Sequence, residues 1–211
     1  MSFGALKDIK IIDLTTRLSG PFSTMLFADQ GAEVIKVEPP KMGDVTRLVG
    51  PFLPNDEKKN HSGYFHSINR NKKSIVLDLK TPEGKAILLT LLKDADAVIE
   101  NFKEGTMEKL GLSYEKLHTL NPKLVYGALR GFGDSRTKAS PYAKYPSYDV
   151  IAQAMGGLMG VSGPDAQTPI KAGPGLGDIF PGMLLAFGIL SAIHHAKACL
   201  LYTSPSPRDR G

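Results

Sequence analysis

Short apolar runs alternate along the chain with segments whose apolar side chains recur at helical spacing. Residues 7–14 (KDIKIIDL) and 33–37 (EVIKV) are rich in β-branched residues and have the length of strands. The apolar spacing within residues 22–30 predicts a helix between them, which Gly31 is placed to end. A strand, a helix and a strand within about 30 residues form the unit of a parallel sheet.

The same alternation continues to the last helical segment. Thr81-Pro82-Glu83 is typical of a helix start, because threonine caps free N–H groups while proline and an acid suit the first turn. The whole pattern predicts an α/β fold, with an open, mostly parallel sheet and flanking helices. The remaining strands are predicted at 74–79, 97–100 and 123–129, and the remaining helices at 82–93, 113–120, 147–158 and 178–198.

This fold class directs attention to the loops that follow the strands. In open parallel sheets, ligands bind beyond the carboxyl ends of the strands. We therefore expect the functional residues in residues 15–18, in the long polar loop over 38–63, at Asn101 and Phe102, and in the loop that begins at Arg130.

The composition is that of a globular protein in a reducing compartment. The 211 residues correspond to about one domain, and the single cysteine excludes a disulfide scaffold and a cysteine-based zinc site. The first residues lack the shape of a signal peptide, and no apolar run approaches the ~20 residues of a spanning helix. The net charge of +5 suits an anionic small ligand as well as nucleic acid, but the sequence has no nucleic-acid recognition motif. We expect a cytoplasmic protein with neither a membrane nor nucleic acid as a partner.

Several common catalytic motifs are missing from the sequence. No G-x-G-x-x-G follows the first predicted strand, and neither a P-loop nor a G-x-S-x-G elbow occurs. None of the five histidines has H-E-x-x-H spacing, so no metal site is predicted.

The last residues, 199–211 (CLLYTSPSPRDRG), differ in character from the rest of the chain. They combine Ser-Pro repeats with alternating charges and offer nothing to bury the far side of the preceding helix. We interpret them as translated read-through that does not belong to the fold, with a natural disordered C-terminus as the alternative. The domain is then residues 1–198, and the sole cysteine, Cys199, has no predicted chemical role.

One carboxylate is conspicuous. Asp178 follows the glycine-rich segment 173–177 (GPGLG) and precedes an apolar helix. It suits an N-cap, where its side chain would bond the free N–H groups of the helix. It also suits a covalent nucleophile, because glycines let a ligand approach the backbone and the helix dipole would keep the carboxylate ionised.

Six segments together carry a resemblance to a known family. They are LSGPFSTMLFADQGAEVIKVEPPKMGDVTR (18–47), NRNKKSIVLDLKTPEG (69–84), VIENFKEGTMEKLGL (98–112), LVYGALRGFG (124–133), YDVIAQAMGGLM (148–159) and GDIFPGMLLAFGIL (177–190). In these segments the chain resembles class III CoA-transferases, the family of formyl-CoA transferase, carnitine-CoA transferase and α-methylacyl-CoA racemase. The resemblance covers nearly all of residues 5–198.

The resemblance implies that residues 1–198 are the first half of the family's large, Rossmann-like domain. Full members are about twice as long, add a small domain and form interlocked homodimers. We therefore expect this chain to be an N-terminal fragment that is inactive alone. We also expect it to aggregate, because the apolar face of its last helix has no partner.

The family's catalytic aspartate falls on Asp178. The resemblance implies that its carboxylate attacks an acyl-CoA thioester to form an aspartyl–acyl anhydride, from which an aspartyl-CoA thioester arises. The substrates would be an acyl-CoA and a small carboxylic acid, with coenzyme A passed between them and no metal required.

Tyr148 separates the transferase branch from the racemase branch. Racemases of the family resemble one another in a G-H-D-I stretch whose histidine transfers a proton, and Tyr148 stands at that position here. A tyrosine with a pKa near 10 is a poor base at neutral pH, so a transferase is favoured over an acyl-CoA racemase or epimerase. Tyr148 is then part of the acyl or CoA pocket, or alternatively a core aromatic at a helix start.

Coenzyme A carries phosphates that lysine and arginine bind well. Arg47 and Arg70 are plausible additions to its site, whereas Pro39 stands where some family members place an arginine. A non-catalytic CoA-binding module remains the alternative to an enzyme. The resemblance assigns CoA contacts to Thr16, Arg17, Leu18, Asn71, Lys72, Lys73, Asn101, Phe102 and Lys109, with Tyr148 beside them.

Overall fold

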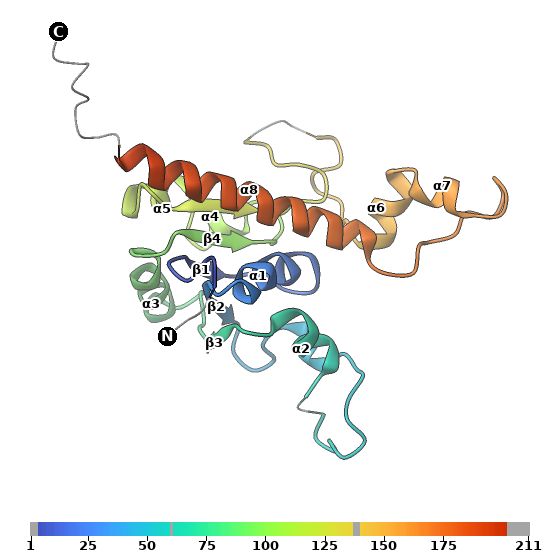
Figure 1. Cartoon of the computed structure of the whole chain (residues 1–211), viewed down its shortest axis with the longest axis horizontal. Helices are drawn as coiled ribbons and strands as arrows, with labels where there is room; N and C mark the ends of the chain where they lie inside the picture. The colour runs from blue at the N-terminus through green and yellow to red at the C-terminus, as the bar shows by residue number, and fades with distance from the viewer. Residues whose placement is uncertain (1–3, 60, 137–139, 202–211) are drawn as a thin grey trace, which may run out of the picture.

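The computed structural model describes residues 4–59, 61–136 and 140–201, which form one sheet with helices on both faces (Figure 1). All paired strands are parallel and follow the order β3-β2-β1-β4-β5, so the predicted α/β class is confirmed. The strands are β1 (Lys10–Asp13), β2 (Glu33–Glu38), β3 (Lys73–Val76), β4 (Ala97–Glu100) and β5 (Val125–Ala128).

Most helices begin close to where the sequence predicts them. Thr81 and Ser113 cap α3 and α5 through their hydroxyls, and α1 begins at Ser19, three residues before the predicted start. The short α2 and α4 were not predicted. The helices are α1 (Ser19–Asp29), α2 (Gly63–Asn69), α3 (Pro82–Leu92), α4 (Thr106–Lys109), α5 (Tyr114–Leu120), α6 (Asp149–Met155), α7 (Leu158–Ser162) and α8 (Leu176–Leu201), with a 3-10 turn η1 (Val45–Leu48).

Two apolar cores lie on the two faces of the sheet. Successive side chains of a strand point to opposite faces, so Ile11 and Ile12 are both fully buried but in different cores. Ile12 packs with Leu88 of α3 and its neighbours, whereas Ile11 packs with residues of α1 and α8 such as Ile189. These cores hold the sheet rigidly beneath the loops at its carboxyl edge.

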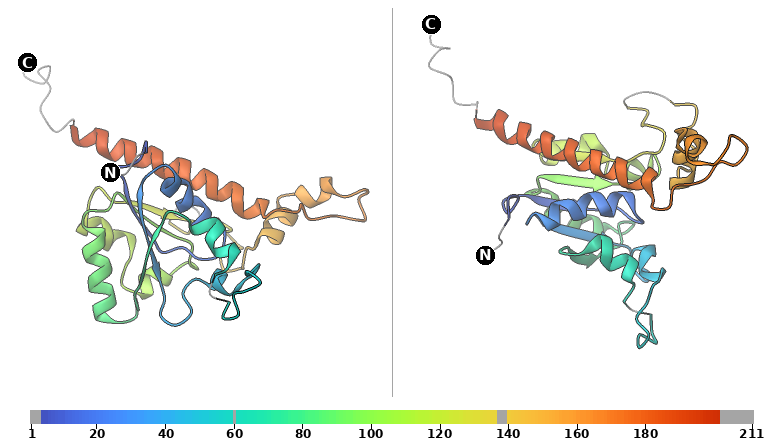
Figure 2. Two further views of the ribbon diagram at one scale, coloured as in Figure 1. Left: turned by 60° about the horizontal axis from the view of Figure 1, so that its bottom comes forward. Right: turned by 45° about the vertical axis from the view of Figure 1, so that its right-hand side comes forward.

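The long helix α8 lies beside α1 and meets α6 at its N-terminal end (Figure 2). It begins at Leu176 rather than at Asp178, and its backbone continues through Cys199 to Leu201. Residues 202–211, most of the predicted read-through segment, lie outside the described residues. The helix approaches α1 closely at Gly182, where an added Cβ would lie 2.6 Å from the Ser19 carbonyl oxygen.

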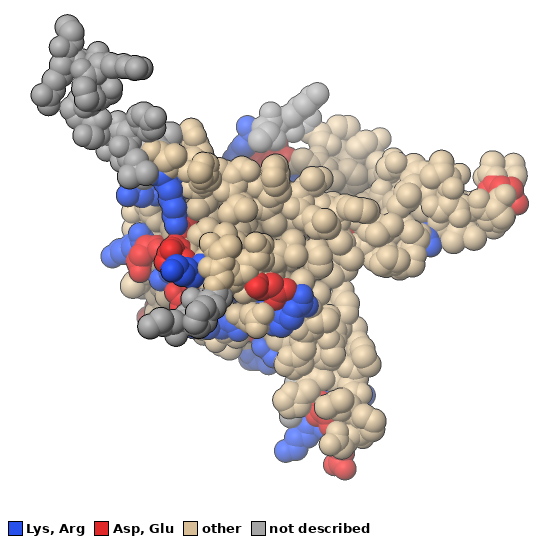
Figure 3. Space-filling model, in the orientation of Figure 1, with Lys and Arg blue, Asp and Glu red and all other residues tan. Residues whose placement is uncertain are grey.

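The outward side of α8 is apolar and uncovered. Phe180, Met183, Leu184 and Phe187 are exposed, and few charged side chains interrupt the surface over this helix (Figure 3). Residues 176–198 are long and apolar enough to cross a membrane by length and composition. The expectation that no apolar run approaches the length of a membrane-spanning helix was therefore wrong. Glycines and histidines interrupt the apolar residues of this segment, so the sequence does not read as one continuous apolar run.

Candidate active site

The loops after β1 and β4 meet at the carboxyl edge of the sheet. In this strand order, β1 and β4 are neighbours at the point where the chain switches direction across the sheet, which is where open α/β sheets bind ligands. The Thr16 N–H donates to Asn101 Oδ1 at 3.0 Å, and Asn101 Nδ2 donates to the Thr16 carbonyl at 2.7 Å. Two residues predicted for the CoA site are therefore joined directly.

The buried carboxylate of Asp44 stabilises the loop that follows β1. Its Oδ2 pairs with Lys36 Nζ at 2.9 Å, and both side chains are almost fully buried. Its Oδ1 accepts hydrogen bonds from Thr16 Oγ1 (3.2 Å) and from the Arg17 N–H (3.3 Å). Lys36 also donates to the Thr15 carbonyl at 2.8 Å. This ion pair fixes the backbone of residues 15–17.

An acid ends each of the strands β1, β2 and β4, and each acid is buried against a cation. The cation comes from a different part of the chain in each case, so the pairs tie the ligand-side segments to the sheet. They are Asp13 with Lys72 (3.1 Å), Glu38 with Arg47 (2.7 Å) and Glu100 with Arg130 (2.6 Å).

Arg17 and Tyr148 approach each other above this edge. Arg17 has the left-handed backbone angle φ 70°, which is uncommon for a residue with a side chain. Its guanidinium carbon lies 5.1 Å from the centre of the Tyr148 ring, a cation–π contact. Tyr148 is 51% exposed, so the reading of this residue as a core aromatic is wrong, although it does precede a helix.

Asp149, the next residue, holds the glycine-rich segment that leads to Asp178. Its Oδ1 accepts the Gly177 N–H at 2.7 Å, and its Oδ2 pairs with Lys171 Nζ at 3.0 Å. Gln153 is buried beside it, donates to Asp149 at 2.9 Å and accepts the Ala172 N–H at 2.9 Å. Helix α6 therefore fixes this segment at both ends, a role that the sequence analysis missed.

Asp178 lies in the first turn of α8, half-buried. It is not an N-cap, because the helix begins two residues earlier and Asp149 takes the Gly177 N–H instead. Burial raises the pKa of Asp178, the Asp149 charge raises it further, and Arg17 and Lys171 act in the opposite direction. Burial and Asp149 together outweigh the two favourable charges, so the pKa of Asp178 lies above that of an ordinary aspartate.

The N-terminus of α1 opens toward the same edge. No side chain caps it, and its first turn carries no acid. A helix N-terminus of this kind presents N–H groups and a positive dipole end to an anion. Leu18, which immediately precedes α1, lies against Gly175, where an added Cβ would come within 2.8 Å of its side chain. The start of α1 and the first turn of α8 are therefore adjacent.

The remaining predicted CoA residues are more dispersed. Lys72 is buried against Asp13 and donates to the Pro21 carbonyl at 2.9 Å, so the structure places it in the core. Asn71 donates to Asp29 at 2.9 Å, and Lys73 pairs with Glu33. Lys109 is exposed on α4, and Phe102 packs partly against the core. Of the suggested additions, Arg47 pairs with Glu38 and Arg70 pairs with Asp29.

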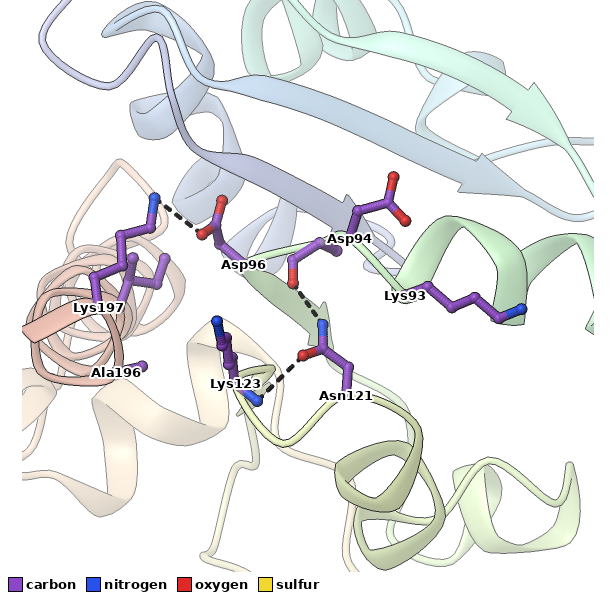
Figure 4. A pocket seen from close by; sticks show the side chains of 9 residues that line it. Lys93, Asp94, Asp96, Asn121, Lys123, Ala196 and Lys197 are labelled. Atoms are coloured by element: carbon purple, nitrogen blue, oxygen red, sulfur yellow. Dashed lines mark hydrogen bonds and ion pairs between the residues drawn. The ribbon is translucent and has the colours of Figure 1, made fainter. Parts of the chain in front are cut away.

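Two cavities lie away from Asp178. One, of about 400 Å³, is at the amino edge of the sheet, where Lys197 pairs with Asp96 at 3.0 Å (Figure 4). Lys197 is 19 residues beyond Asp178 on α8, which is about 28 Å along the helix. The other, of about 480 Å³, lies beside Tyr126 and Arg130 at the end of β5. Within the described residues, no group of three His, Cys, Asp or Glu side chains could hold a metal ion.

The sequence also matches a known protein family. Residues 6–199 match the model of CoA-transferase family III. The chain belongs to this family.

Individual relatives agree with this assignment. The chain is 50% identical over 194 residues to the succinyl-CoA:mesaconate CoA-transferase of Haloarcula hispanica, covering 92% of the chain and 49% of that protein. It is 47% identical to the succinate–glutarate CoA-transferase of Agrobacterium fabrum, covering 90% and 47%. A CAIB/BAIF family protein from Brucella suis superposes with a TM-score of 0.86 at 40% identity, covering 93% and 51%. The chain spans about half the length of the curated relatives it matches.

Proposed function

We propose that the protein carrying this chain transfers coenzyme A from an acyl-CoA to a carboxylic acid, with Asp178 as the covalent nucleophile. The observation that carries the proposal is the position of this half-buried carboxylate, beside the loop at the switch point of a family III sheet. The two curated relatives are named for succinate, mesaconate and glutarate, so dicarboxylic acids are the first acceptors to test.

The reaction begins when an Asp178 oxygen attacks the thioester carbonyl carbon. The C–S bond breaks, CoA leaves as a thiolate, and a mixed anhydride remains on Asp178. The thiolate then attacks the aspartyl carbonyl, which releases the donor acid and forms an aspartyl-CoA thioester. The acceptor carboxylate displaces the thiolate to form a second anhydride, and the thiolate attacks the acceptor's carbonyl to release the new acyl-CoA and free Asp178.

The residues around Asp178 suit these steps. Burial and Asp149 destabilise the free carboxylate charge, which favours its conversion into a neutral anhydride or thioester. The open N-terminus of α1 supplies N–H donors for an oxyanion or a phosphate at the same edge. Thr16, Leu18, Asn101 and Phe102 would lie along the bound CoA, with Lys109 further out on α4.

The role of Asp178 can be tested by trapping the intermediate. Full-length enzyme from the complete reading frame is incubated with an acyl-CoA and hydroxylamine, and its peptides are analysed by mass spectrometry. We expect a hydroxamate on Asp178, since hydroxylamine captures an anhydride or thioester. Asp178→Asn should abolish transfer and trapping but retain CoA binding, whereas Asp165→Asn, an exposed control, should retain all three. An active enzyme with an unmodified Asp178 peptide would count against the mechanism.

A further inference from the structure

The guanidinium of Arg17 differs from those of the other arginines in having no partner of opposite charge. Of the five arginines in the described ranges, it alone makes no ion pair, and no hydrogen bond from its side chain occurs there. The others are held by carboxylates, as Arg47 is by Glu38 and Arg136 is by Asp134. The five N–H donors of Arg17 are therefore available to a ligand.

The backbone holds this side chain in a definite place. The Arg17 N–H bonds to the buried Asp44, and the residue keeps a left-handed φ of 70° that is energetically unfavourable for arginine. The ring of Tyr148 then supports one side of the guanidinium. A solvated surface arginine would need neither a fixed backbone nor an aromatic ring beside its guanidinium. The two features together indicate a preformed anion site.

The site lies at the turn that carries the nucleophile. Leu18 lies against Gly175 and the Ser19 carbonyl against Gly182. The residues that follow Arg17 therefore contact the chain on both sides of Asp178. On the other side, Tyr148 is followed by Asp149, which bonds Gly177. The other cation near Asp178, Lys171, is already paired with Asp149 at 3.0 Å. Of these two cations, Arg17 is the one without an ion pair in the described ranges, so a substrate held at Asp178 would meet it.

We propose that Arg17 binds the distal carboxylate of a dicarboxylic acid whose other carboxylate reacts at Asp178, and so selects dicarboxylic over monocarboxylic acceptors. A guanidinium matches a carboxylate with two parallel hydrogen bonds, a geometry that lysine does not reproduce. A monocarboxylic acid would leave these donors unmatched. The inference rests on the proposed CoA transfer and assigns its substrate class. It also differs from the resemblance, which places Arg17 among the CoA contacts.

The test compares acceptors that differ in one carboxylate. The full-length enzyme is assayed with acetyl-CoA as donor and with glutarate or valerate as acceptor, so that only the acceptor carries a distal charge. We expect Arg17→Gln to lower kcat/KM for glutarate about 10–100-fold and to change that for valerate less than about 3-fold. Arg17→Lys should restore only part of the loss. Lys80→Gln, an exposed cation near α3, should alter neither acceptor.

Three other outcomes would contradict either the role of Arg17 or the proposed function. Equal losses for both acceptors with a raised KM for acetyl-CoA would make Arg17 a CoA ligand and overturn the proposal. Unchanged kinetics with both acceptors would also overturn it. Failure of the unsubstituted enzyme to transfer CoA to any acid would instead contradict the proposed function, so the two failures are distinguishable.

Discussion

At the scale of single residues, opposing charges set the ionisation of Asp178. Burial and Asp149 raise its pKa, while Arg17 and Lys171 lower it. In the proposed mechanism the ionised carboxylate attacks the thioester, so transfer by the full-length enzyme should decline as the pH falls through this raised pKa. Asp149 itself has a lowered pKa, since hydrogen bonds from Gln153 and Lys171 outweigh the effect of its burial. It is therefore still charged where Asp178 titrates.

Two substitutions should shift this titration in opposite directions. Asp149→Asn removes a negative charge but keeps an oxygen for the Gly177 N–H, so the acid limb of kcat/KM should move to lower pH. Lys171→Gln removes a positive charge, so the limb should move to higher pH. The measurement is the pH profile of transfer for both variants. Shifts of the same sign would contradict this account of the site's electrostatics.

The sequence identifies some of these residues and misses others for a physical reason. Asp178 stands out because glycines precede it and an apolar helix follows. The contributions of Asp149 and Asp44 depend on contacts made across 28 and 27 residues, with Gly177 and with Arg17, and no local pattern marks such contacts. The resemblance placed Lys72 among the CoA contacts, and a lysine in a polar segment is expected at the surface. Folding instead buries it against Asp13, which no local pattern indicates.

At the scale of elements, two glycines of α8 provide a matched pair. An added methyl at Gly182 would lie 2.6 Å from the Ser19 carbonyl, whereas nothing lies within 4 Å at Gly188. Gly182→Ala should therefore push α8 away from α1 and destabilise the chain by about 1–3 kcal/mol. Gly188→Ala should stabilise it by about 0.5–1 kcal/mol, because alanine favours the helix.

Because the apolar face of α8 favours association, both variants are made in the 211-residue chain carrying Leu184→Glu and Phe187→Glu. Thermal unfolding is followed by circular dichroism with that doubly substituted chain as the reference, and the two glycine variants should shift the midpoint in opposite directions. A higher midpoint for Gly182→Ala would contradict the close approach of the two helices.

The main elements could be predicted from the local pattern, and the errors fall where that pattern is weak. Strands and capped helices that build the cores have clear apolar periods. The predicted helix over 147–158 corresponds to α6, which ends at Met155. Gly157, with a φ of 82°, separates it from α7, which was not predicted. The helix α2 was missed because it lies within a polar, proline-rich stretch. It packs against α1 and η1, so its helical form depends on tertiary contacts.

At the scale of the whole molecule, the uncovered side of α8 is the dominant surface feature. Leu184 and Phe187 are each more than 70% exposed on a face with few charges. A contiguous apolar surface of this kind promotes association in water. We expect the 211-residue chain, expressed alone, to elute in light-scattering chromatography as a mixture of oligomers.

Two substitutions on that face of α8 test whether it causes the association. Leu184→Glu with Phe187→Glu should shift the population toward monomer, whereas Ile87→Glu, an exposed apolar control on α3, should not. A monodisperse unsubstituted chain, or oligomers that persist in the double variant, would show that this face is not responsible.

Because α8 comes late in the chain, the sheet and the carboxylate of the candidate site are synthesised one after the other. The fifth strand is complete at Ala128, but Asp178, the proposed nucleophile, lies 50 residues later and the helix that carries it ends at Leu201. At about 5–20 residues per second, a ribosome needs roughly 4–15 s to make the intervening chain. During that interval the sheet can form while the face that Ile189 and Ile193 will cover is still open to solvent. In the growing polypeptide, the proposed nucleophile therefore reaches its place only when α8 closes that face.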